Sequence, residues 1–481
     1  MADLPPLYAA ARPRHPRAAP GGPAARSAPS PAEARSAEAA AETATVSGLT
    51  RDGEGVVRAG KTVFVAGALP GERILFRRTR RHRQHDDGEL LELLSASPER
   101  VAPRCAHFGV CGGCALQHLS GAAQLAAKET ELKDTLARVG RVEPASWLEP
   151  LAGPEWGYRR RARLGVKFVH KKGCVVVGFR ERAAPYVAQL SRCEVLTAPV
   201  GELIAPLAVM LGELSIREQL PQIEVAVADN ATALVLRVLA TPSEADLARL
   251  REFAGAHRLR LYLQPGGLDS VRELEPPGEP LRYALAGAGV ELEFAPTDFI
   301  QVNGAVNDAL IARAGKLLEL DGSSSLLDLY CGLGNFTLAL ARSAGRVVGV
   351  EAEGALIERA RGNAARNRIA NAEFHRADLG TPPDPALPWM RESYTHVLLD
   401  PPRTGARAVL AAVAALAPRR VLYVSCHPGS LARDLSMLVH EHGFELEKAG
   451  VVDMFPHTAH VESLALLVPG GRRTAAGRPA A

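Results

Sequence analysis

The chain has 481 residues, more than a single hydrophobic core accommodates, so we expect two to four domains. Hydrophobic residues make up 47% and the net charge is only +4, yet no window reaches the roughly 18 consecutive apolar residues of a membrane span. The N-terminus carries Asp3 and lacks the apolar segment of a secretory signal, so we expect a cytoplasmic protein with no membrane contact.

The first region, residues 1–44, is rich in Ala, Pro and Arg, with eight prolines before residue 32. This composition predicts a disordered tail, and we expect a second short flexible tail at 471–481. From 45 to 103 the chain shows short alternating runs broken by DGEG, RAGK and LPGE, which predicts a small antiparallel β-barrel. Six arginines between Arg73 and Arg83 belong to a solvated hairpin or to a phosphate-contacting surface.

Residues 104–290 mix strand and helix patterns, which predicts an α+β central domain. Within it, "RARLGVKFV" (161–169) alternates and predicts a strand with one basic face. Basic side chains track phosphate and interleaved aromatic residues stack on bases, so this strand either binds RNA or is an ordinary charged face.

The cysteines at 105, 111 and 114 form a C-x5-C-x2-C cluster, "CAHFGVCGGC". An odd total of seven cysteines without a signal peptide argues against disulfides and favours metal binding or catalysis. Cys193 is the candidate fourth ligand, while Cys174 has no partner. Four thiolates suit zinc or a 4Fe–4S cluster. Zinc sites usually pair two C-x2-C motifs, and the chain lacks the second, so we favour iron–sulfur.

Residues 291–470 alternate apolar strands with helical patterns, which predicts an α/β domain with a parallel, doubly wound, Rossmann-like sheet. The expected strands are 326–330, 346–352, 395–402, 419–426 and 462–468. Ligands of such sheets bind at the carboxyl ends of the strands. Glu351, Asp400 and Cys426 all fall at such ends.

The first strand leads into "DLYCGLGNFT" (328–337), a glycine turn that lets a ligand approach the backbone. Such a turn alone fits a dinucleotide loop or any tight turn. Asp328 would repel a pyrophosphate but suits the ammonium of an amino-acid cofactor, and Glu351 can accept both ribose hydroxyls. Together they fit S-adenosylmethionine. We expect Cys331, in the same loop, to be structural.

Asp400 opens "DPPRTG" and can bind a base edge or the amino-acid end of the cofactor. Cys426 in "VSCHPG" is a buried thiol, half of a metal site or a nucleophile. Adjacent side chains of an extended chain point apart, which excludes a zinc site from Cys426 and His427. A thiolate there can attack C6 of a pyrimidine and activate C5 for methylation. Glu462 can then remove the C5 proton.

Taken jointly, these motifs and "FIQVN" (299–303) resemble the RNA uridine C5-methyltransferase family, most closely its 23S ribosomal RNA branch. The resemblance covers about 45–470, and the barrel looks like a TRAM domain. It implies that Cys426 is the nucleophile, that Glu462 is the base, and that part of 117–148 packs on the catalytic domain. It implies a 4Fe–4S cluster ligated by Cys105, Cys111, Cys114 and Cys193. It implies that these residues contact S-adenosylmethionine: Gln301, Tyr330, Asn335, Glu351, Asp378 and Asp400.

One position departs from the family pattern, S-C-N-P, because His427 replaces the asparagine. The departure puts a hydrogen bond from that asparagine to uracil in doubt, and a cationic His427 could lower the thiol pKa. The resemblance implies methylation of a ribosomal RNA uridine by a monomer without an obligate protein partner. The alternatives are the same chemistry on transfer RNA and an inactive RNA-binding homologue. Cytosine methylation is disfavoured, since Arg403 rather than cysteine follows Pro402.

Overall fold

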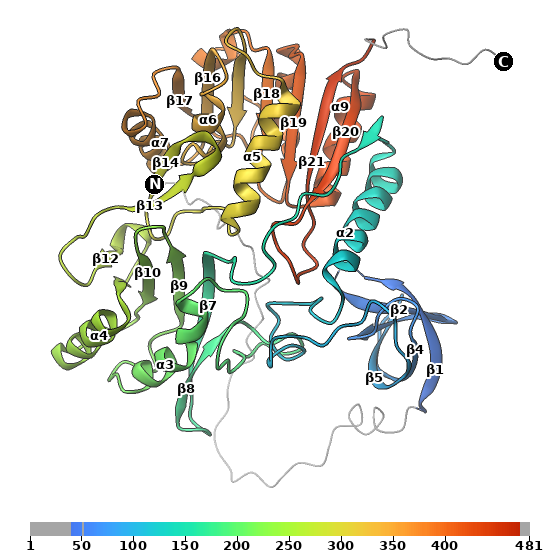
Figure 1. Cartoon of the computed structure of the whole chain (residues 1–481), viewed down its shortest axis with the longest axis vertical. Coiled ribbons are helices and arrows are strands. Elements are labelled where there is room, and N and C mark those ends of the chain that lie inside the picture. Colours follow the sequence, from blue (N-terminus) through green and yellow to red (C-terminus); the bar gives the residue numbers. More distant parts are fainter. Residues whose placement is uncertain (1–39, 51, 472–481) are drawn as a thin grey trace, which may run out of the picture.

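The computed structural model describes residues 40–50 and 52–471 (Figure 1). The tails predicted at 1–44 and 471–481 therefore fall almost entirely outside the described residues. The described strands form a closed barrel, a six-stranded sheet, a two-stranded hairpin and an eight-stranded sheet. Within these ranges, none of the helices has both the length and the apolar character needed to cross a bilayer.

The barrel has the strand order β1-β2-β3-β5-β4. Its strands are β1 (Glu42–Leu49), β2 (Glu54–Ala59), β3 (Lys61–Ala66), β4 (Arg73–Arg81) and β5 (Asp86–Ser95). Gly60 alone joins β2 to β3 with a φ of 68°, which glycine adopts without steric cost. The interior is filled by Val46, Val57, Val63, Val65, Ala68, Ile74 and Phe76. The predicted small barrel is confirmed, and it begins at Glu42, three residues before the expected start. The prediction that it is antiparallel throughout is wrong for one pair, since β3 and β5 run parallel.

A buried ion pair fixes where the chain leaves the barrel. The fully buried Glu72 carboxylate accepts hydrogen bonds from Arg100 Nε at 2.5 Å and Arg100 Nη2 at 2.8 Å. It also accepts the N–H of Leu69 at 2.8 Å and that of Ser97 at 3.2 Å. These donors compensate the desolvated charge, so the segment after β5 is held against the barrel wall.

The six-stranded sheet has the order β12-β11-β10-β9-β7-β8 and is antiparallel except between β10 and β11. The strands are β7 (Arg161–Val169), β8 (Cys174–Gly178), β9 (Gln222–Val227), β10 (Thr232–Arg237), β11 (Leu259–Gln264) and β12 (Arg272–Glu273). Helices α3 (Val200–Gly212) and α4 (Glu244–His257) and a 3-10 turn (Leu268–Ser270) accompany them. On β7, Arg163 and Lys167 are exposed and Leu164 and Val166 are buried, so the predicted strand with a basic face is confirmed.

The hairpin β13 (Leu281–Leu285) and β14 (Val290–Phe294), joined by the 3-10 turn Ala286–Ala288, leads to the eight-stranded sheet. Its order is β17-β16-β15-β18-β19-β21-β20-β6. The strands are β15 (Ser325–Leu329), β16 (Arg346–Glu351), β17 (Ala372–Arg376), β18 (His396–Leu399), β19 (Arg420–Ser425), β20 (Phe444–Val452), β21 (Glu462–Pro469) and β6 (Ser146–Trp147). Its helices are α5 (Gly304–Leu318), α6 (Asn335–Leu340), α7 (Gly354–Arg366), α8 (Leu410–Ala415) and α9 (Pro428–His440), with 3-10 turns at Pro388–Arg391 and Arg407–Val409.

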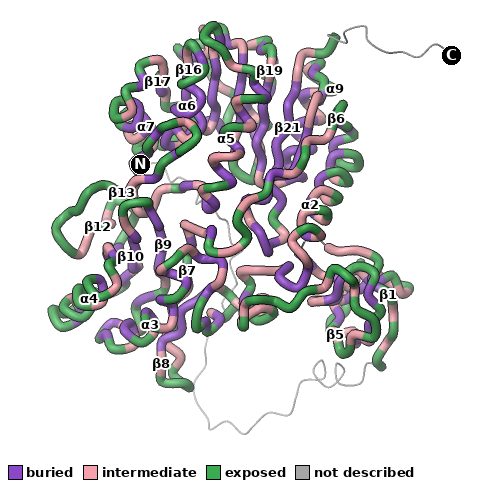
Figure 2. Tube along the Cα trace, in the orientation of Figure 1, coloured by how far each residue is buried: buried purple, intermediate pink, exposed green. Residues whose placement is uncertain are grey.

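Alternate residues of this sheet face two separate cores. Leu326, Val347 and Leu398 pack in a core that includes α5, α6 and α7, whereas Leu327 and Val348 pack in the core that includes α8 and α9. Both faces are therefore covered, and the central strands β15, β16, β18 and β19 are buried along most of their length (Figure 2). Helices on both faces of a largely parallel sheet were predicted and are confirmed.

The prediction of an all-parallel sheet is wrong for one strand. β21 runs antiparallel to β19 and to β20, while β15, β16, β17, β18 and β19 are mutually parallel. The short connection 453–461 joins β20 to its neighbour β21 without a crossover helix, and such a connection produces an antiparallel pair. The reversal brings the start of β21, rather than its end, to the edge where the parallel strands terminate.

Two elements from early in the chain complete the C-terminal sheet. Helix α2 (Gly121–Thr135) continues in a π-helical turn (Leu136–Gly140) that packs on α9, and β6 pairs with β20. Figure 1 shows α2 beside β20 and β21, between the barrel and the sheet. The expectation that part of 117–148 packs on the later domain is confirmed, and this helix reaches the functional site.

Candidate active site

Neighbouring parallel strands deliver polar side chains to one edge of the eight-stranded sheet. Asp328 lies on β15, Glu351 ends β16, Asp400 follows β18 and Cys426 follows β19. Because β16, β15, β18 and β19 are adjacent and parallel, their carboxyl ends meet at this edge, where ligands of such sheets bind. The prediction that Glu351, Asp400 and Cys426 lie at strand ends is confirmed.

The glycine turn after β15 is shaped by Glu351. Gly332 and Gly334 adopt φ of 57° and 96°, which keeps side chains out of the turn and leads into α6. Glu351 Oε2 accepts the N–H of Gly332 at 3.2 Å, and Oε1 accepts the N–H of Ala352 at 2.6 Å. The carboxylate therefore holds the turn and the end of its own strand together, whatever else it binds.

Two acidic side chains lie without a cation at the centre of this edge. Thr337 Oγ1 donates to Asp328 Oδ2 at 2.5 Å, and Asp328 Oδ1 has no hydrogen-bond partner among the described residues. Burial, and next to it the charge of Asp400, raises the pKa of Asp328 to about 7. Burial likewise raises the pKa of Asp400 to about 7. Since an added cation favours ionised carboxylates, this edge is suited to a positively charged ligand.

Three other residues of the predicted cofactor set lie in connecting segments outside the strands and helices. Gln301 lies in the segment between β14 and α5. Tyr330 follows β15 with a φ of 67° and donates its hydroxyl hydrogen to Leu379 O at 3.1 Å. Asp378, exposed after β17, accepts the N–H of Gly380 at 2.8 Å. The Tyr330 hydrogen bond therefore joins the turn after β15 to the segment after β17.

Asn335 differs from this set, because its side-chain amide is engaged by α5. Its Oδ1 accepts hydrogen bonds from Asn307 Nδ2 at 2.9 Å and from Tyr283 at 3.1 Å, and its Nδ2 donates to Asn307 Oδ1 at 3.0 Å. This pairing fixes the first residue of α6 against α5 and the β13–β14 hairpin. In this structure the amide supports the glycine turn from behind.

Strand register places Cys426 beside Glu462. The antiparallel pair of β19 and β21 aligns Ser425 with Ser463, and continuing that register by one residue aligns Cys426 with Glu462. On the other side, β20 aligns Val452 with Glu462. Glu462 is thus held between two strands, and its side chain is only 4% exposed. The predicted nucleophile and the predicted base are brought together.

Burial, reinforced by the local charges, favours the protonated form of both groups near neutral pH. Burial, followed by the charges of Glu462 and Asp400, raises the pKa of Cys426 to about 11, and Arg403 opposes this effect. Burial and the charge of Asp400 raise the pKa of Glu462 to about 8. Glu462 Oε2 has no hydrogen-bond partner among the described residues. An acidic residue held this way can exchange a proton with a ligand placed beside it.

His427 caps helix α9 in the way an asparagine does. Its Nδ1 accepts the N–H of Ser430 at 3.1 Å, and Pro428 occupies the first helical turn. Nδ1 is bonded to Cγ just as the Oδ1 of asparagine is, so the two side chains present an acceptor at the same position. An imidazolium has no lone pair at Nδ1, so the cap requires neutral His427. A cationic His427 that assists Cys426 is incompatible with this geometry.

The four predicted metal-binding cysteines line one cavity of about 190 Å³. Burial raises the pKa of Cys111 to about 11 and that of Cys114 to about 12, and the cysteines raise one another further. Gly113 donates its N–H to Cys111 Sγ at 3.4 Å. A Cβ on Gly112 would lie 2.9 Å from Arg180 O, so only glycine allows this close wrap. The structure therefore brings Cys105, Cys111, Cys114 and Cys193 together as free thiols.

The loop that carries these cysteines is attached to the connection before Glu462. His457 O accepts the N–H of Ala115 at 2.9 Å and that of Leu116 at 3.0 Å, immediately after Cys114. The His457 ring packs against Trp156 in a tilted arrangement, with centroids 3.8 Å apart. The cysteine loop and the connection between β20 and β21 therefore share one set of hydrogen bonds.

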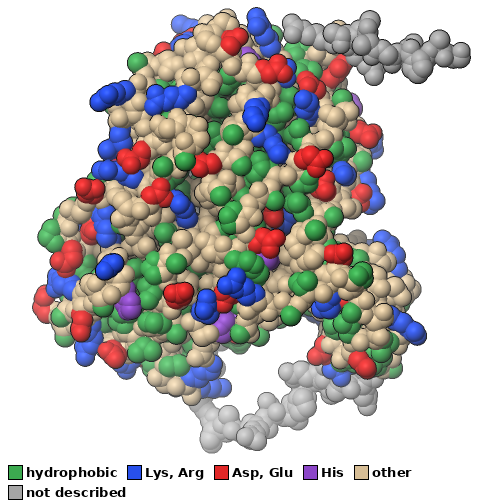
Figure 3. All heavy atoms as spheres, in the orientation of Figure 1, with side chains coloured by type: hydrophobic (Ala, Val, Ile, Leu, Met, Phe, Trp, Pro, Cys, Tyr) green, Lys and Arg blue, Asp and Glu red, His purple; other side chains and the backbone are tan. Residues whose placement is uncertain are grey.

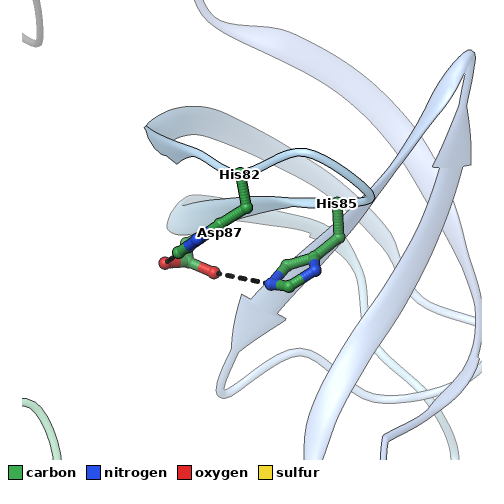
Figure 4. A group of neighbouring side chains, drawn as sticks. All are labelled: His82, His85 and Asp87. Atoms are coloured by element: carbon green, nitrogen blue, oxygen red, sulfur yellow. Dashed lines mark hydrogen bonds and ion pairs between the residues drawn. The ribbon is translucent and has the colours of Figure 1, made fainter.

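A separate group on the barrel, His82, His85 and Asp87, has ligand atoms within 4.8 Å of one another (Figure 4). It lies at the partly exposed tip between β4 and β5, where His82 Nε2 pairs with Asp87 Oδ2 at 2.9 Å and the two rings stack at 4.5 Å. Arg81 and Arg83 lie on the same tip. Their charge opposes a divalent cation, and the ion pair accounts for the group without one.

Strand order and edge chemistry define the class of protein: a class I methyltransferase-like α/β fold whose sheet edge suits a cationic donor. Among solved structures, a tRNA (uracil-54, C5)-methyltransferase of Pyrococcus abyssi in complex with S-adenosyl-L-homocysteine shares the fold. It has a TM-score of 0.68 and 24% identity, and the alignment covers 89% of this chain and 100% of that one.

Sequence comparison identifies the family. The family model for tRNA (Uracil-5-)-methyltransferase matches residues 280–380 and 389–469. The 23S rRNA (uracil(1939)-C(5))-methyltransferase of Nitrosococcus oceani is 49% identical over 87% of this chain and 94% of that protein. That of Alkalilimnicola ehrlichii is 50% identical over the same shares. The chain belongs to the RNA uracil-C5 methyltransferase family.

The cap formed by His427 leads to a stability prediction. His427→Ala removes the acceptor for the N–H of Ser430 and should lower the free energy of unfolding by about 1 kcal/mol, the usual cost of a lost N-cap. His427→Asn should retain wild-type stability, because it supplies an equivalent oxygen. Urea unfolding at pH 8 measures both. Equal stability of His427→Ala and the wild type would show that the side chain does not cap α9.

Proposed function

We propose that this protein transfers the methyl group of S-adenosylmethionine to C5 of a uridine in 23S ribosomal RNA. The observation that carries the proposal is the alignment of Cys426 with Glu462, beside Asp400, at the carboxyl edge of the sheet. The relatives named for this reaction on 23S rRNA match nearly their whole length to this chain, which supports the same substrate class.

The acidic groups at the strand ends are proposed to bind the methyl donor. The donor carries an ammonium and a sulfonium. Asp328 is buried and Asp400 is partly buried, and neither carboxyl group forms an ion pair with another of the described residues. Glu351 is proposed to hold the ribose, at the end of the strand next to the glycine turn. Gln301, Tyr330 and Asp378 are proposed to complete the site, and Asn335 is proposed to contribute through the position of α6.

Cys426 and Glu462 are proposed to carry the chemistry. The thiolate of Cys426 bonds to C6 of uracil, which leaves the electron pair on C5 and its carbonyl. C5 then takes the methyl group and keeps its hydrogen. Glu462 removes that proton, the C5–H electrons restore the C5–C6 double bond, and the sulfur leaves C6. Because Glu462 and Asp400 disfavour the thiolate, it is expected to form only when the substrates place positive charge and hydrogen-bond donors nearby.

The barrel, assigned to 45–103, is proposed to be a TRAM-like RNA-binding domain. Arg77 and Arg78 of β4 pair with acidic neighbours, whereas Arg80, Arg81 and Arg83 are exposed. Acidic and basic side chains are interspersed on the face seen in Figure 3. Individual arginines, rather than one continuous basic field, are therefore proposed to contact phosphates, with the exposed basic face of β7.

The central region 104–290 is proposed to hold a 4Fe–4S cluster, and 291–470 to be the catalytic domain. The four thiols share one cavity. A 4Fe–4S cluster ligated by these cysteines would supply a rigid cross-link between the loops of Cys105–Cys114 and Cys193.

Donor affinity should depend on pH through the two buried carboxyl groups. Asp328 and Asp400 have pKa values of about 7 without a cation, so below pH 7 they must lose protons before they pair with one. Affinity for S-adenosylmethionine should therefore fall as pH drops from 8 to 6, by up to about tenfold per unit for each carboxyl group. Calorimetry in buffers of different ionisation enthalpy measures affinity and proton release.

Asp384→Asn is the matched control for this titration, because Asp384 is exposed and is not part of the proposed donor site, so the change should leave the pH dependence unchanged. Asp400→Asn should flatten it. Affinity that is constant from pH 6 to 8 would remove the two buried carboxyl groups from the donor site.

The covalent steps give each residue a distinct signature. Cys426→Ala should bind RNA and donor without forming a protein–RNA conjugate. Glu462→Gln should transfer one labelled methyl group and then stall as a conjugate that survives denaturing gels. RNA with 5-fluorouridine should trap the wild type in the same way, because fluorine does not leave as a cation. Cys174→Ala, a change at a cysteine remote from this edge, should behave as the wild type.

The same assay tests the substrate. Transcripts of 23S ribosomal RNA should be methylated, and transfer RNA should not. Methylation of transfer RNA alone would show that transfer RNA, not ribosomal RNA, is the substrate. Absence of methylation on either RNA would favour an inactive RNA-binding protein. A protein–RNA conjugate formed by Cys426→Ala would exclude Cys426 as the nucleophile.

The cluster proposal predicts iron in the purified protein. Anaerobic preparations should be brown and hold about four irons per chain. Cys193→Ser should lose iron and the associated absorption, since it removes one of four ligands, whereas Cys174→Ser should keep both because Cys174 does not line the cavity. One zinc per chain in a colourless sample would contradict the proposal.

A further inference from the structure

Helix α2 contains a lysine that is almost completely removed from water. The side chain of Lys128 is 2% exposed, its Nζ lies 2.6 Å from Asp453 Oδ1, and it donates to Phe455 O at 3.0 Å. A buried ammonium costs several kcal/mol of desolvation, which a single ion pair repays only in part. Apolar residues of similar volume would pack α2 as well, so the charge itself calls for an explanation.

The position of Lys128 connects it to Glu462. Asp453 follows directly on Val452, the residue that β20 aligns with Glu462. Lys128 thus holds the first residues of the connection 453–461, whose last residue precedes Glu462. Tyr158 secures the middle of the same connection with a hydrogen bond to Pro456 O at 3.0 Å. The strand position of Glu462 is therefore supported from both sides.

The charges that act on Glu462 come from three directions. Asp400, after β18, is negative, and Cys426, after β19, becomes negative as a thiolate. Lys128, from α2, supplies positive charge that opposes the rise in the pKa of Glu462, whose largest cause is burial and whose next cause is Asp400. Burial in turn lowers the pKa of Lys128, and Asp453 and Glu462 oppose that effect. Arg403 acts on Cys426 from beyond Pro402.

We propose that Lys128 is a positioning residue for the final step of methylation, in which its buried ammonium favours the ionised form of Glu462 and supports the orientation from which Glu462 removes the C5 proton. The inference rests on the role of Glu462 proposed above. Lys128 itself transfers no proton: the C5 proton goes to Glu462, and the C5–H electron pair expels the sulfur. Asp453 is proposed to hold the Lys128 ammonium between helix α2 and the connection 453–461.

The test must separate charge from structure. Lys128→Met alone strands the Asp453 carboxylate in the interior, which destabilises any fold. The double variant Lys128→Met/Asp453→Asn removes both charges and keeps the volume. Without the ammonium, the folded pKa of Glu462 should rise further, so the carboxylate becomes available only at higher pH. The acidic limb of turnover should move upward by about one pH unit, a tenfold loss of rate at pH 7 that disappears at high pH.

Two measurements besides the turnover rate report on the protonation of Glu462. At pH 7 the double variant should accumulate the methylated protein–RNA conjugate that the wild type resolves. Infrared titration of the holoenzyme, with Glu462→Gln to assign the carboxyl band, should show the band of Glu462 titrating at higher pH in the variant. Arg100→Met/Glu72→Gln, which removes the buried pair of the barrel, is the matched control. It should lose stability without moving the limb or the band.

The outcomes distinguish this inference from the function on which it rests. Wild-type protein that forms no conjugate with 5-fluorouridine RNA would overturn the proposed function. Wild-type turnover combined with an unchanged limb and band in the double variant would overturn the role of Lys128 alone. Should the double variant fail to fold, Lys128→Arg and Lys128→Gln provide the comparison. Lys128→Arg should leave the acidic limb of the pH–rate profile in place, and Lys128→Gln should shift it to higher pH. The same limb position in both variants would refute the proposal.

Discussion

The candidate site depends on the reversed strand β21. Between β19 and β20, it runs against its neighbours, so its first residue reaches the edge where the parallel strands end. A parallel strand at this place would present its start at the opposite edge of the sheet. The pairing Ser425–Ser463 and Val452–Glu462 then fixes Glu462 beside Cys426 through backbone hydrogen bonds on both sides. A shift of one residue would turn Glu462 to the other face of the sheet.

Around this register the protein gathers acidic groups that it does not neutralise. Asp328, Asp400 and Glu462 all have raised pKa values, with burial as the largest cause. Each gains from a positive charge, and the described residues provide few: Lys128 opposes the shift at Glu462, and Arg403 the shift at Cys426. A cationic donor that binds at such a site stabilises the ionised forms of these carboxyl groups. Binding of the donor and readiness for chemistry are then linked through the same carboxyl groups.

The sequence was informative where the hydrophobic period was strong. The barrel, β7 and the strands ending near Glu351, Asp400 and Cys426 were predicted because their apolar residues alternate or run continuously. β20 was missed because "FELEKAGVV" carries charged residues on a strand that is half exposed at its start, and β6 is only two residues long. The direction of β21 was missed because an apolar run carries no information on direction. Lys128 belongs to no motif, and only its burial reveals it. Thr337 ends the quoted glycine turn, but only the structure shows its hydrogen bond to Asp328.

The hydrogen bonds of Lys128 and His457 join parts of the chain that are far apart in sequence, since Lys128 and Asp453 are 325 residues apart. β6 likewise pairs with a strand, β20, that lies much later in the chain. During synthesis, α2 leaves the ribosome long before the strands on which it packs, so the sheet edge cannot close until β20 and β21 have been synthesised. A truncated chain that ends before β20 retains the barrel and the cysteine loop but has no partner for Ala115, Leu116 or Lys128. Assembly of the site therefore depends on the synthesis of β20 and β21.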